Sequence, residues 1–156
     1  MTTSENKRLI KTRFGKEVEI TDKNLVTIKD GLLGFETYES YAVIPHGDES
    51  PFLWLQSLDE PQLAFITIDP RIFAQDYVPN FSENELSSIE LTSISEAVLL
   101  AIVVIPDDPK LMTANLQAPI VINAKNRQGK QMISSSQEHK VRHYILGKNG
   151  EPPEKK

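Results

Sequence analysis

Short apolar runs separated by turn residues make up most of the hydropathy pattern of this chain. The runs are rich in Val, Ile, Phe, Tyr, Trp and Thr, whose side chains suit a pleated and half-buried strand. Helical periodicity is rare, so the pattern favours an all-β domain over alternating strands and helices. The predicted strands cover residues 8–14, 17–20, 25–28, 41–44, 52–58, 63–68, 98–105, 120–123 and 130–134.

The most apolar of these runs, VLLAIVVI at 98–105, has no polar residue on either face of a strand. It is predicted to lie at the centre of the fold, covered on both sides. Two short helices are predicted as well. Ser82 and Glu85 have the spacing of a capping box, and Pro109 follows an aspartate at a first helical position. Weaker signals indicate a third helix at 136–145.

Roughly ten strands with so little helix predict a closed or nearly closed β-barrel, mainly antiparallel, because closure removes exposed sheet edges. A chain of 156 residues fits one domain of this kind and can bury a core without metal or disulfides. The barrel domain is expected at 1–146. The segment 147–156, GKNGEPPEKK, is predicted to be a disordered charged tail, because it cannot bury enough apolar surface to order itself.

The composition excludes several classes of site. There is no cysteine, which rules out disulfides, thiolate zinc sites, iron–sulfur clusters and cysteine nucleophiles. The N-terminal stretch MTTSENKRLIKTRF lacks the apolar core of a signal peptide, and the longest apolar run is far too short to span a bilayer. A cytoplasmic protein is therefore expected.

The net charge of −5 is unevenly distributed. Residues 17–109 contain 18 acidic and 3 basic side chains, a net charge of −15, whereas the two ends together contain 14 basic and 4 acidic side chains, a net charge of +10. These charges either solvate a surface whose basic ends fold beside an acidic body, or form an acidic face that steers a basic partner. Direct nucleic-acid binding is disfavoured, because phosphates require a basic face.

A search for catalytic chemistry finds no convincing candidates. His139 and His143 would share one face of the predicted third helix, a spacing that can hold a metal. No third ligand is evident nearby, and Lys140 and Arg142 would repel a cation, so a solvated basic helix is favoured over a metal-dependent hydrolase. No nucleophile elbow, Ser/His/Asp set or phosphate-binding loop is recognisable. No catalytic residue, metal or cofactor is therefore predicted.

Amide side chains carry the first binding signal, in the stretch TANLQAPIVIN at 113–123. Amides hydrogen-bond strongly but are poor acids, bases or nucleophiles. Asn115 and Gln117 would therefore brace a loop through backbone groups, contact a partner, or do both, since loops on rigid sheets often carry recognition. Asn115, Leu116 and Gln117 are predicted partner-binding residues.

The strand around the only tryptophan carries the second binding signal. Alternation places Phe52, Trp54 and Gln56 on one face, and Leu53 and Leu55 on the other. If the two leucines point inward, the aromatic side chains form an exposed patch that suits an interface. The alternative is that both faces are buried in the barrel wall. Phe52, Trp54 and Gln56 complete the predicted partner-binding set.

Six short sequence stretches, which follow one another along the chain, carry a resemblance to a known family. They are GLLGFE at 31–36, PFLWLQS at 51–57, LAFI at 63–66 with DP at 69–70, DY at 76–77, TANLQAPIVIN at 113–123 and QMI at 131–133. In this order the chain resembles the FliW family of flagellar assembly factors. The resemblance extends over about residues 9–145.

The resemblance implies a small barrel-like cytoplasmic protein without catalysis and with two protein partners, the RNA-binding translational regulator CsrA and flagellin. In such systems the factor binds the regulator and lifts repression of flagellin messenger RNA, and free flagellin captures the factor and restores repression. The alternative function is a small-ligand-binding β-barrel with Trp54 near its cavity.

Overall fold

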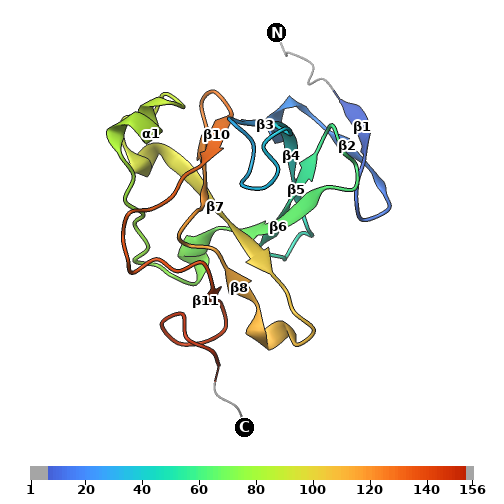
Figure 1. The fold of residues 1–156 in the computed structure, drawn as a ribbon. Helices are drawn as coiled ribbons and strands as arrows, with labels where there is room; N and C mark the ends of the chain where they lie inside the picture. The colour runs from blue at the N-terminus through green and yellow to red at the C-terminus, as the bar shows by residue number, and fades with distance from the viewer. Residues whose placement is uncertain (1–6, 154–156) are drawn as a thin grey trace.

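The computed structural model describes residues 7–153 and folds most of them around a β-sheet (Figure 1). The strands are β1 (Arg8–Lys11), β2 (Glu17–Ile20), β3 (Leu25–Ile28), β4 (Ser40–Pro45), β5 (Phe52–Ser57), β6 (Ala64–Ile68), β7 (Ala97–Val104), β8 (Thr113–Ala114), β9 (Ile120–Asn123), β10 (Gln128–Gln131) and β11 (His143–Tyr144). The helices are α1 (Glu83–Ser87) and the short 3-10 helices η1 (Asp22–Asn24), η2 (Pro70–Ile72), η3 (Ile94–Glu96) and η4 (Pro109–Leu111).

Seven strands close into a barrel. Neighbouring strands pair in the order β7, β6, β5, β4, β3, β10 and β9, and β9 then returns to β7, where Leu100 pairs with Ile120. All pairings in this ring are antiparallel except that of β10 with β3. The predicted all-β, mainly antiparallel barrel with few helices is confirmed.

Strand alternation gives the barrel an apolar interior. Val26, Tyr41, Leu55, Leu100 and Ile122 belong to one buried cluster, and each lies on a different strand of the ring. Because side chains alternate along a strand, their sequence neighbours point outward and need a second layer to cover them. The fold therefore contains more than a simple filled barrel.

Two outer layers supply that cover on opposite sides of the barrel (Figure 1). The β1–β2 hairpin packs over the outer face of β4, where Ile20 and Ile44 form a small buried cluster. On the other side, the chain from η2 to η3, with α1, packs over β7 and β9. Ile89 and Leu91 there share a buried cluster with Val121.

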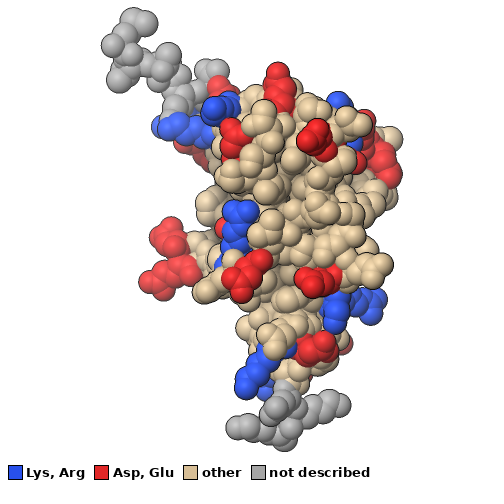
Figure 2. All heavy atoms as spheres, turned by 90° about the vertical axis from the view of Figure 1, so that its left-hand side faces the viewer, with Lys and Arg blue, Asp and Glu red and all other residues tan. Residues whose placement is uncertain are grey.

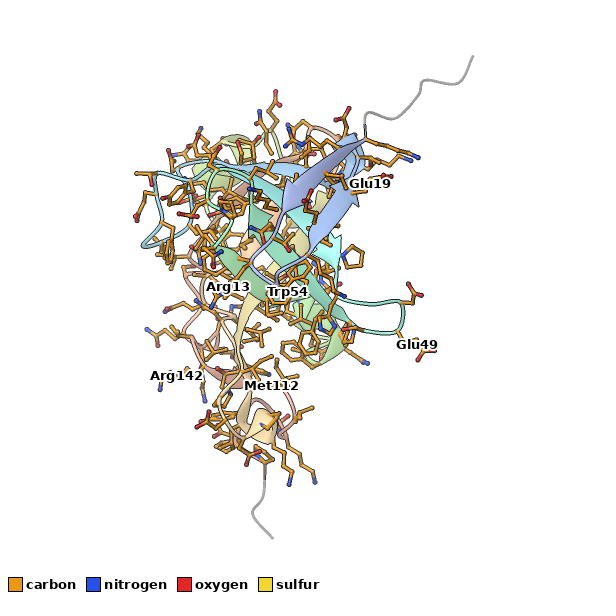
Figure 3. The ribbon with its side chains drawn as sticks, turned by 90° about the vertical axis from the view of Figure 1, so that its right-hand side faces the viewer. Arg13, Glu19, Glu49, Trp54, Met112 and Arg142 are labelled. Carbon is orange, nitrogen blue, oxygen red and sulfur yellow. The ribbon has the colours of Figure 1, made fainter. Side chains whose placement is uncertain are left out.

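The loop after β3 closes one end of the barrel. Leu32 is 1% exposed and joins the interior cluster, so it acts as a plug. Gly31 has φ +69, and a Cβ atom at this position would lie 2.6 Å from the Cα of Glu36, so the tight turn requires glycine. The β4–β5 loop, which carries Glu49, extends from the opposite end (Figure 3).

β7 continues beyond the barrel into a small three-stranded extension at the bottom of Figure 1. Its last two residues pair with β8 instead of β9, and β8 pairs in turn with β11. The prediction that this strand is covered on both sides is wrong at its ends. Val98 is 45% exposed at the barrel opening, and Val104 is 64% exposed on the extension, because the strand passes outside the packed layers at both points.

Two of the three predicted helices are confirmed. Ser82 caps α1 by accepting a hydrogen bond from the Glu85 N–H at 3.1 Å, and Pro109 opens η4. The predicted helix at 136–145 is wrong, since this segment contains turns and the strand β11. Its backbone is bonded to other parts of the chain, for example through the Ile145 N–H to the Met112 carbonyl at 3.2 Å, and these bonds replace helical ones.

The segment from residue 147, expected to be a disordered tail, folds back on the extension as far as it is described. The Gly150 carbonyl accepts a hydrogen bond from the Tyr144 N–H at 3.0 Å, and Lys140 forms an ion pair with Glu151 at 3.1 Å. The structure thus gives residues 147–153 contacts with β11 and its approach. Residues 154–156 of the expected tail lie outside the described part of the chain.

Candidate partner-binding surfaces

Asn115 has the bracing role predicted for the 113–123 stretch. Its side-chain oxygen accepts hydrogen bonds from the N–H groups of Gln117 at 3.1 Å and Ala118 at 3.0 Å, which fixes a tight turn after β8. The Gln117 side chain is exposed and makes no comparable bond within residues 7–153. Of these two amides, Asn115 therefore holds the loop and Gln117 faces outward.

Leu116, between them, belongs to the core. Its side chain is 2% exposed, its N–H donates to the Lys140 carbonyl at 2.9 Å, and its carbonyl accepts from the Tyr77 hydroxyl at 2.6 Å. Burial of the Tyr77 ring raises the pKa of that hydroxyl well above its ordinary value, so it remains a donor. In this conformation the Leu116 side chain offers no surface to a partner, and its predicted contact role stays a prediction.

Asn123, the last amide of the stretch, joins the barrel to the layer around α1. Its side-chain nitrogen donates to the carbonyls of Ile89 at 2.9 Å and Glu90 at 3.3 Å, and its oxygen accepts from the Lys125 N–H at 2.9 Å. The residue is 5% exposed, so these bonds satisfy an amide that would otherwise be costly to bury.

The second predicted set lies on the outside of the barrel wall. Leu53 and Leu55 point into the interior cluster, so Phe52, Trp54 and Gln56 face outward, as required for an aromatic patch. The patch is only partly open, because residues 12–16 of the β1–β2 hairpin cover this face. Figure 3 shows Trp54 beneath the hairpin, near Arg13.

Contacts on this face differ from one residue to the next. The Trp54 ring stacks on Phe14 with centroids 5.0 Å apart, and the His46 ring lies 6.3 Å from Trp54 and 6.5 Å from Phe52. Gln56 is completely buried, and its amide is bonded to backbone groups of the hairpin and the β5–β6 turn. Phe52 and Trp54 thus keep partial exposure, whereas Gln56 is structural in this conformation.

The two predicted sets lie on different strands, although Phe52 packs against the same buried cluster that contains Leu116. The Asn115 N–H bonds to the Ile102 carbonyl on β7, and Phe52 lies on β5, with β6 between these strands. Trp54 is also separated from the barrel cavity, because it points to the outer side of β5. The geometry that would place Trp54 near a ligand inside the barrel is therefore absent.

Gln131 holds together a different surface. It was not among the residues predicted from the sequence to bind a partner. Its side-chain oxygen accepts from the Leu33 N–H at 2.8 Å, and its nitrogen donates to the Ala118 carbonyl at 3.0 Å. The Gln117 carbonyl accepts from the Ser134 N–H at 2.7 Å. Three segments far apart in sequence, 31–36, 115–119 and 131–134, are joined in this way.

Apolar side chains remain exposed where these segments meet. Leu33 is 58%, Phe35 39% and Ile133 60% exposed, and Gln117 lies beside them on the neighbouring loop. We call these four residues the plug surface. The sequence signal was present in the apolar GLLGFE and QMI stretches, but only the fold shows that they adjoin and that Leu32 and Met132 are the members that turn inward.

Acidic groups border the plug surface. The Gly34 N–H donates to the Glu36 carboxylate at 3.0 Å, and this bond holds the pKa of Glu36 below its ordinary value. Asp30 and Glu39 are exposed on the same loop, where the Asp30 N–H donates to the Glu39 carboxylate at 2.9 Å. The loop that carries Leu33 and Phe35 therefore has three exposed carboxylates against one exposed base, Lys29, and so combines exposed apolar groups with a net negative charge.

The two histidines considered for a metal site line one cavity of about 550 Å³ with Tyr77. The His139 Nδ1 atom lies 2.8 Å from the Ser134 hydroxyl, and the His143 ring packs against Phe73 with centroids 5.3 Å apart. Within residues 7–153, no group of three or more His, Cys, Asp and Glu side chains has a metal-binding arrangement.

Both histidines have a pKa below the ordinary value, mainly because burial disfavours the charged ring. Lys140 adds a repulsion that lowers the pKa of His143 further, and Glu151 opposes it. Glu138 opposes the effect of burial on the pKa of His139. Both rings are therefore held as neutral packing groups near pH 7.

The charge asymmetry of the sequence is less marked on the folded surface. Figure 2 shows acidic and basic side chains in small separate groups on the face that carries α1, with broad uncharged surface between them. The ion pair of Lys130 with Glu85 at 3.0 Å shows a base from the C-terminal third beside an acid of the central segment. No helix in the described part of the chain has the length and apolar character needed to cross a bilayer.

The fold and these surfaces define a small closed β-barrel with apolar side chains exposed at one end. Comparison with known proteins gives the family. The profile of the FliW protein family matches residues 8–145, and the chain belongs to this family. The predicted resemblance is confirmed over nearly the same range.

Individual relatives agree. The chain is 46% identical over 130 residues to a flagellar assembly factor FliW of Leptospira biflexa, covering 83% of this chain and 85% of the relative. It is 40% identical over 137 residues to one of Treponema denticola, covering 88% and 92%. A crystal structure of the flagellar assembly factor FliW superposes with a TM-score of 0.81 at 32% identity, covering 90% of this chain and 99% of the other.

Proposed function

We propose that this protein is a flagellar assembly factor that acts by binding two proteins in the cytoplasm, a CsrA-type RNA-binding regulator and flagellin, without catalysing a reaction. Membership of the FliW family supports the role in flagellar assembly. The amide-rich loop and the exposed apolar side chains near it suit binding more than chemistry.

The plug surface is the observation that carries the proposal. Leu33 and Ile133 are each more than half exposed and lie in adjoining segments, and such apolar groups are typical of an interaction site. Asp30, Glu36 and Glu39 border them, which favours a basic partner. An RNA-binding regulator has basic surface by necessity, since it neutralises phosphates. We therefore assign the plug surface to the regulator.

Flagellin then acts by mass action. A competing partner shifts the population of the regulator complex only by its own affinity and free concentration. If the two partners use different surfaces, release of the regulator is allosteric, and the regulator weakens flagellin binding by the same factor. Either arrangement makes free flagellin the signal that controls the regulator.

Calorimetric titration with the cognate regulator and with flagellin tests the function. We expect saturable binding of each, and displacement of the regulator when flagellin is added to the preformed complex. If either protein fails to bind, the proposal that this protein acts through both partners is wrong. Binding of both without displacement would keep the two partners and remove the competition.

Matched variants test the surface. Leu33→Ser and Ile133→Ser should each weaken regulator binding by about tenfold, because each removes an exposed apolar contact from the assigned interface. The controls are Leu9→Ser on β1 and Ile72→Ser in η2, which change the same residue types at 63% and 55% exposure on other parts of the molecule. Equal effects of test and control variants would show that the regulator docks elsewhere.

A further inference from the structure

The end of the barrel opposite the plug is an open apolar cup. Its volume of about 340 Å³ lies at the lower end of the range for small-molecule pockets. Interior side chains of five barrel strands form its wall, and residues of η1 and of the β9–β10 turn form its rim. The lining residues are Lys23, Asn24, Val26, Val43, Pro45, Leu53, Val98, Leu100, Ile122, Ala124 and Arg127.

The rim of this cup is basic. Lys23 and Arg127 are its two charged lining residues, and no acidic residue lines it, although residues 17–109 carry a net charge of −15. Asp22 precedes Lys23 but is not part of the lining. The charged lining residues of the cup are therefore basic, whereas the segment that builds most of its wall is acidic. An apolar cavity with a positive rim complements an amphipathic anion.

Arg127 is held in place over the rim. Its N–H donates to the Asn123 carbonyl at 2.9 Å, its carbonyl accepts from the Thr27 N–H at 3.1 Å, and its guanidinium donates to the Lys23 carbonyl. These bonds fix the residue at φ 63, a left-handed conformation that a non-glycine residue adopts only where the surrounding structure holds it. The side chain is thus positioned by the fold.

The guanidinium retains unused donors. It has five N–H groups, and the bond to the Lys23 carbonyl is its one hydrogen bond to residues 7–153. A carboxylate suits the remaining donors, because its two oxygens match the planar fork.

We propose that the open end of the barrel binds a free aliphatic carboxylate, with the hydrocarbon chain in the cup and the carboxylate on Arg127. The chain would contact Val26, Leu53 and Leu100, which are interior residues of three different strands. This site lies at the other end of the barrel from the plug surface. Its occupancy can therefore be measured without either protein partner, and its failure would leave the proposed function intact.

Methyl NMR on the full-length chain with octanoate tests the proposal. We expect saturable shifts at the methyl groups of Val26, Val98 and Ile122, with the Leu33 and Ile133 methyl groups of the plug surface unchanged. Tryptophan fluorescence is a poor reporter, because Trp54 points to the outer side of β5. Absence of saturable shifts at the cup, or shifts centred on the plug surface, would overturn the proposal.

Two related probes separate the contributions of chain and charge. Octylammonium has the same number of carbon atoms with the opposite charge, and acetate has the same charge almost without a chain. Each should bind at least about tenfold more weakly than octanoate, because each lacks one half of the recognition. Binding of octylammonium as tight as that of octanoate would contradict the assignment of the carboxylate to Arg127.

Variants locate the site. Arg127→Asn should weaken octanoate binding about tenfold while keeping the fold, since asparagine tolerates the left-handed conformation. Val98→Asp, at a position 45% exposed, should weaken it by placing a like charge at the cup entrance. The control is Arg142→Asn, which removes the same charge from the exposed C-terminal segment (Figure 3). If Arg127→Asn and Arg142→Asn weaken octanoate binding equally, the effect is due to the net charge of the protein and the proposed site is wrong.

Discussion

The buried amide of Gln56 accepts a hydrogen bond from the Arg13 N–H at 2.9 Å and so joins the β1–β2 hairpin to the barrel wall. The other end of the amide donates to the carbonyls of Ser57 at 3.0 Å, Pro61 at 3.0 Å and Leu63 at 3.2 Å. One side chain thus satisfies backbone groups of two separate loops over the same strand.

Replacement of Gln56 should be costly. Gln56→Ala leaves the Arg13 N–H without its acceptor and removes a donor from the Ser57 and Pro61 carbonyls, whereas the Leu63 carbonyl keeps its bond from the Ser57 N–H; it should lower the free energy of unfolding by about 2 to 4 kcal/mol. Denaturant unfolding measures this. Gln62→Ala is the control, because Gln62 is exposed on the next turn, and it should change stability by less than about 0.5 kcal/mol. Similar losses in both variants would contradict the structural role of Gln56.

Two glycines of the plug loop should respond differently to alanine. Both have positive φ, +69 at Gly31 and +89 at Gly34, but a Cβ at Gly31 would lie 2.7 Å from the Phe35 carbonyl oxygen, whereas one at Gly34 meets nothing within 4 Å. Gly34→Ala should cost about 1 kcal/mol from backbone strain alone. Gly31→Ala should cost at least about 2 kcal/mol, because the backbone must also move. Equal thermal shifts for the two variants would count against the tight plug turn.

The amides of the 113–123 stretch should separate stability from binding. Asn115→Ala removes the acceptor for two N–H groups and should destabilise the protein by about 1 kcal/mol, and Asn115→Asp should restore most of that, since a carboxylate also accepts. Gln117→Ala should leave the melting temperature unchanged and weaken the regulator complex. Thermal melts and binding curves on the same samples provide the comparison. A destabilised Gln117→Ala would reverse the assignment.

Acidification should loosen the C-terminal segment through His139 and His143. Their pKa values in the folded protein lie below the ordinary value of about 6.5, so below that pH the unfolded chain binds more protons. Their contribution to stability is complete above about pH 6.5 and declines as the pH falls towards the folded values. Denaturant midpoints at pH 7 and pH 5 measure the slope.

The double variant His139→Gln/His143→Gln controls this experiment. It should show a smaller loss of stability between pH 7 and pH 5 than the parent protein, whatever its stability at pH 7. The carboxylates of the protein titrate in both proteins, so their contribution cancels in the comparison. An unchanged slope would mean that neither ring is held neutral by the fold.

Local pattern was sufficient to predict most of the barrel strands. Alternation and β-branched side chains identify β3 to β7 and β9 within a few residues, and β10 begins two residues and ends three residues before the predicted strand. The two-residue strands β8 and β11 carry no periodic signal. They form because β7 continues past the ring and offers free backbone groups at Val103 and Val104, a consequence of closure that no short window contains.

Polar side chains were harder to interpret, because burial depends on distant segments. Gln56 alternates correctly with Leu55 and faces outward, but the hairpin around Arg13 lies over it and makes it structural. Gln131 is the converse case, because it was not among the predicted site residues. The QMI stretch that contains it supports the family resemblance but does not show its role, which is to join the loops around Leu33 and Ala118 where β10 ends.

β7 has one constraint that follows from its place in both the ring and the extension. Leu100 points into the barrel and Val103 into the outer layer, so the number of residues between them fixes which side every later side chain takes. Deletion or insertion of a single residue here would exchange the inward-facing and outward-facing side chains in the rest of β7. Both the barrel and the three-stranded extension would then lose their packing. The β4–β5 loop carries no such restriction, so we expect relatives in this family to differ in the length of that loop and to keep one length in β7.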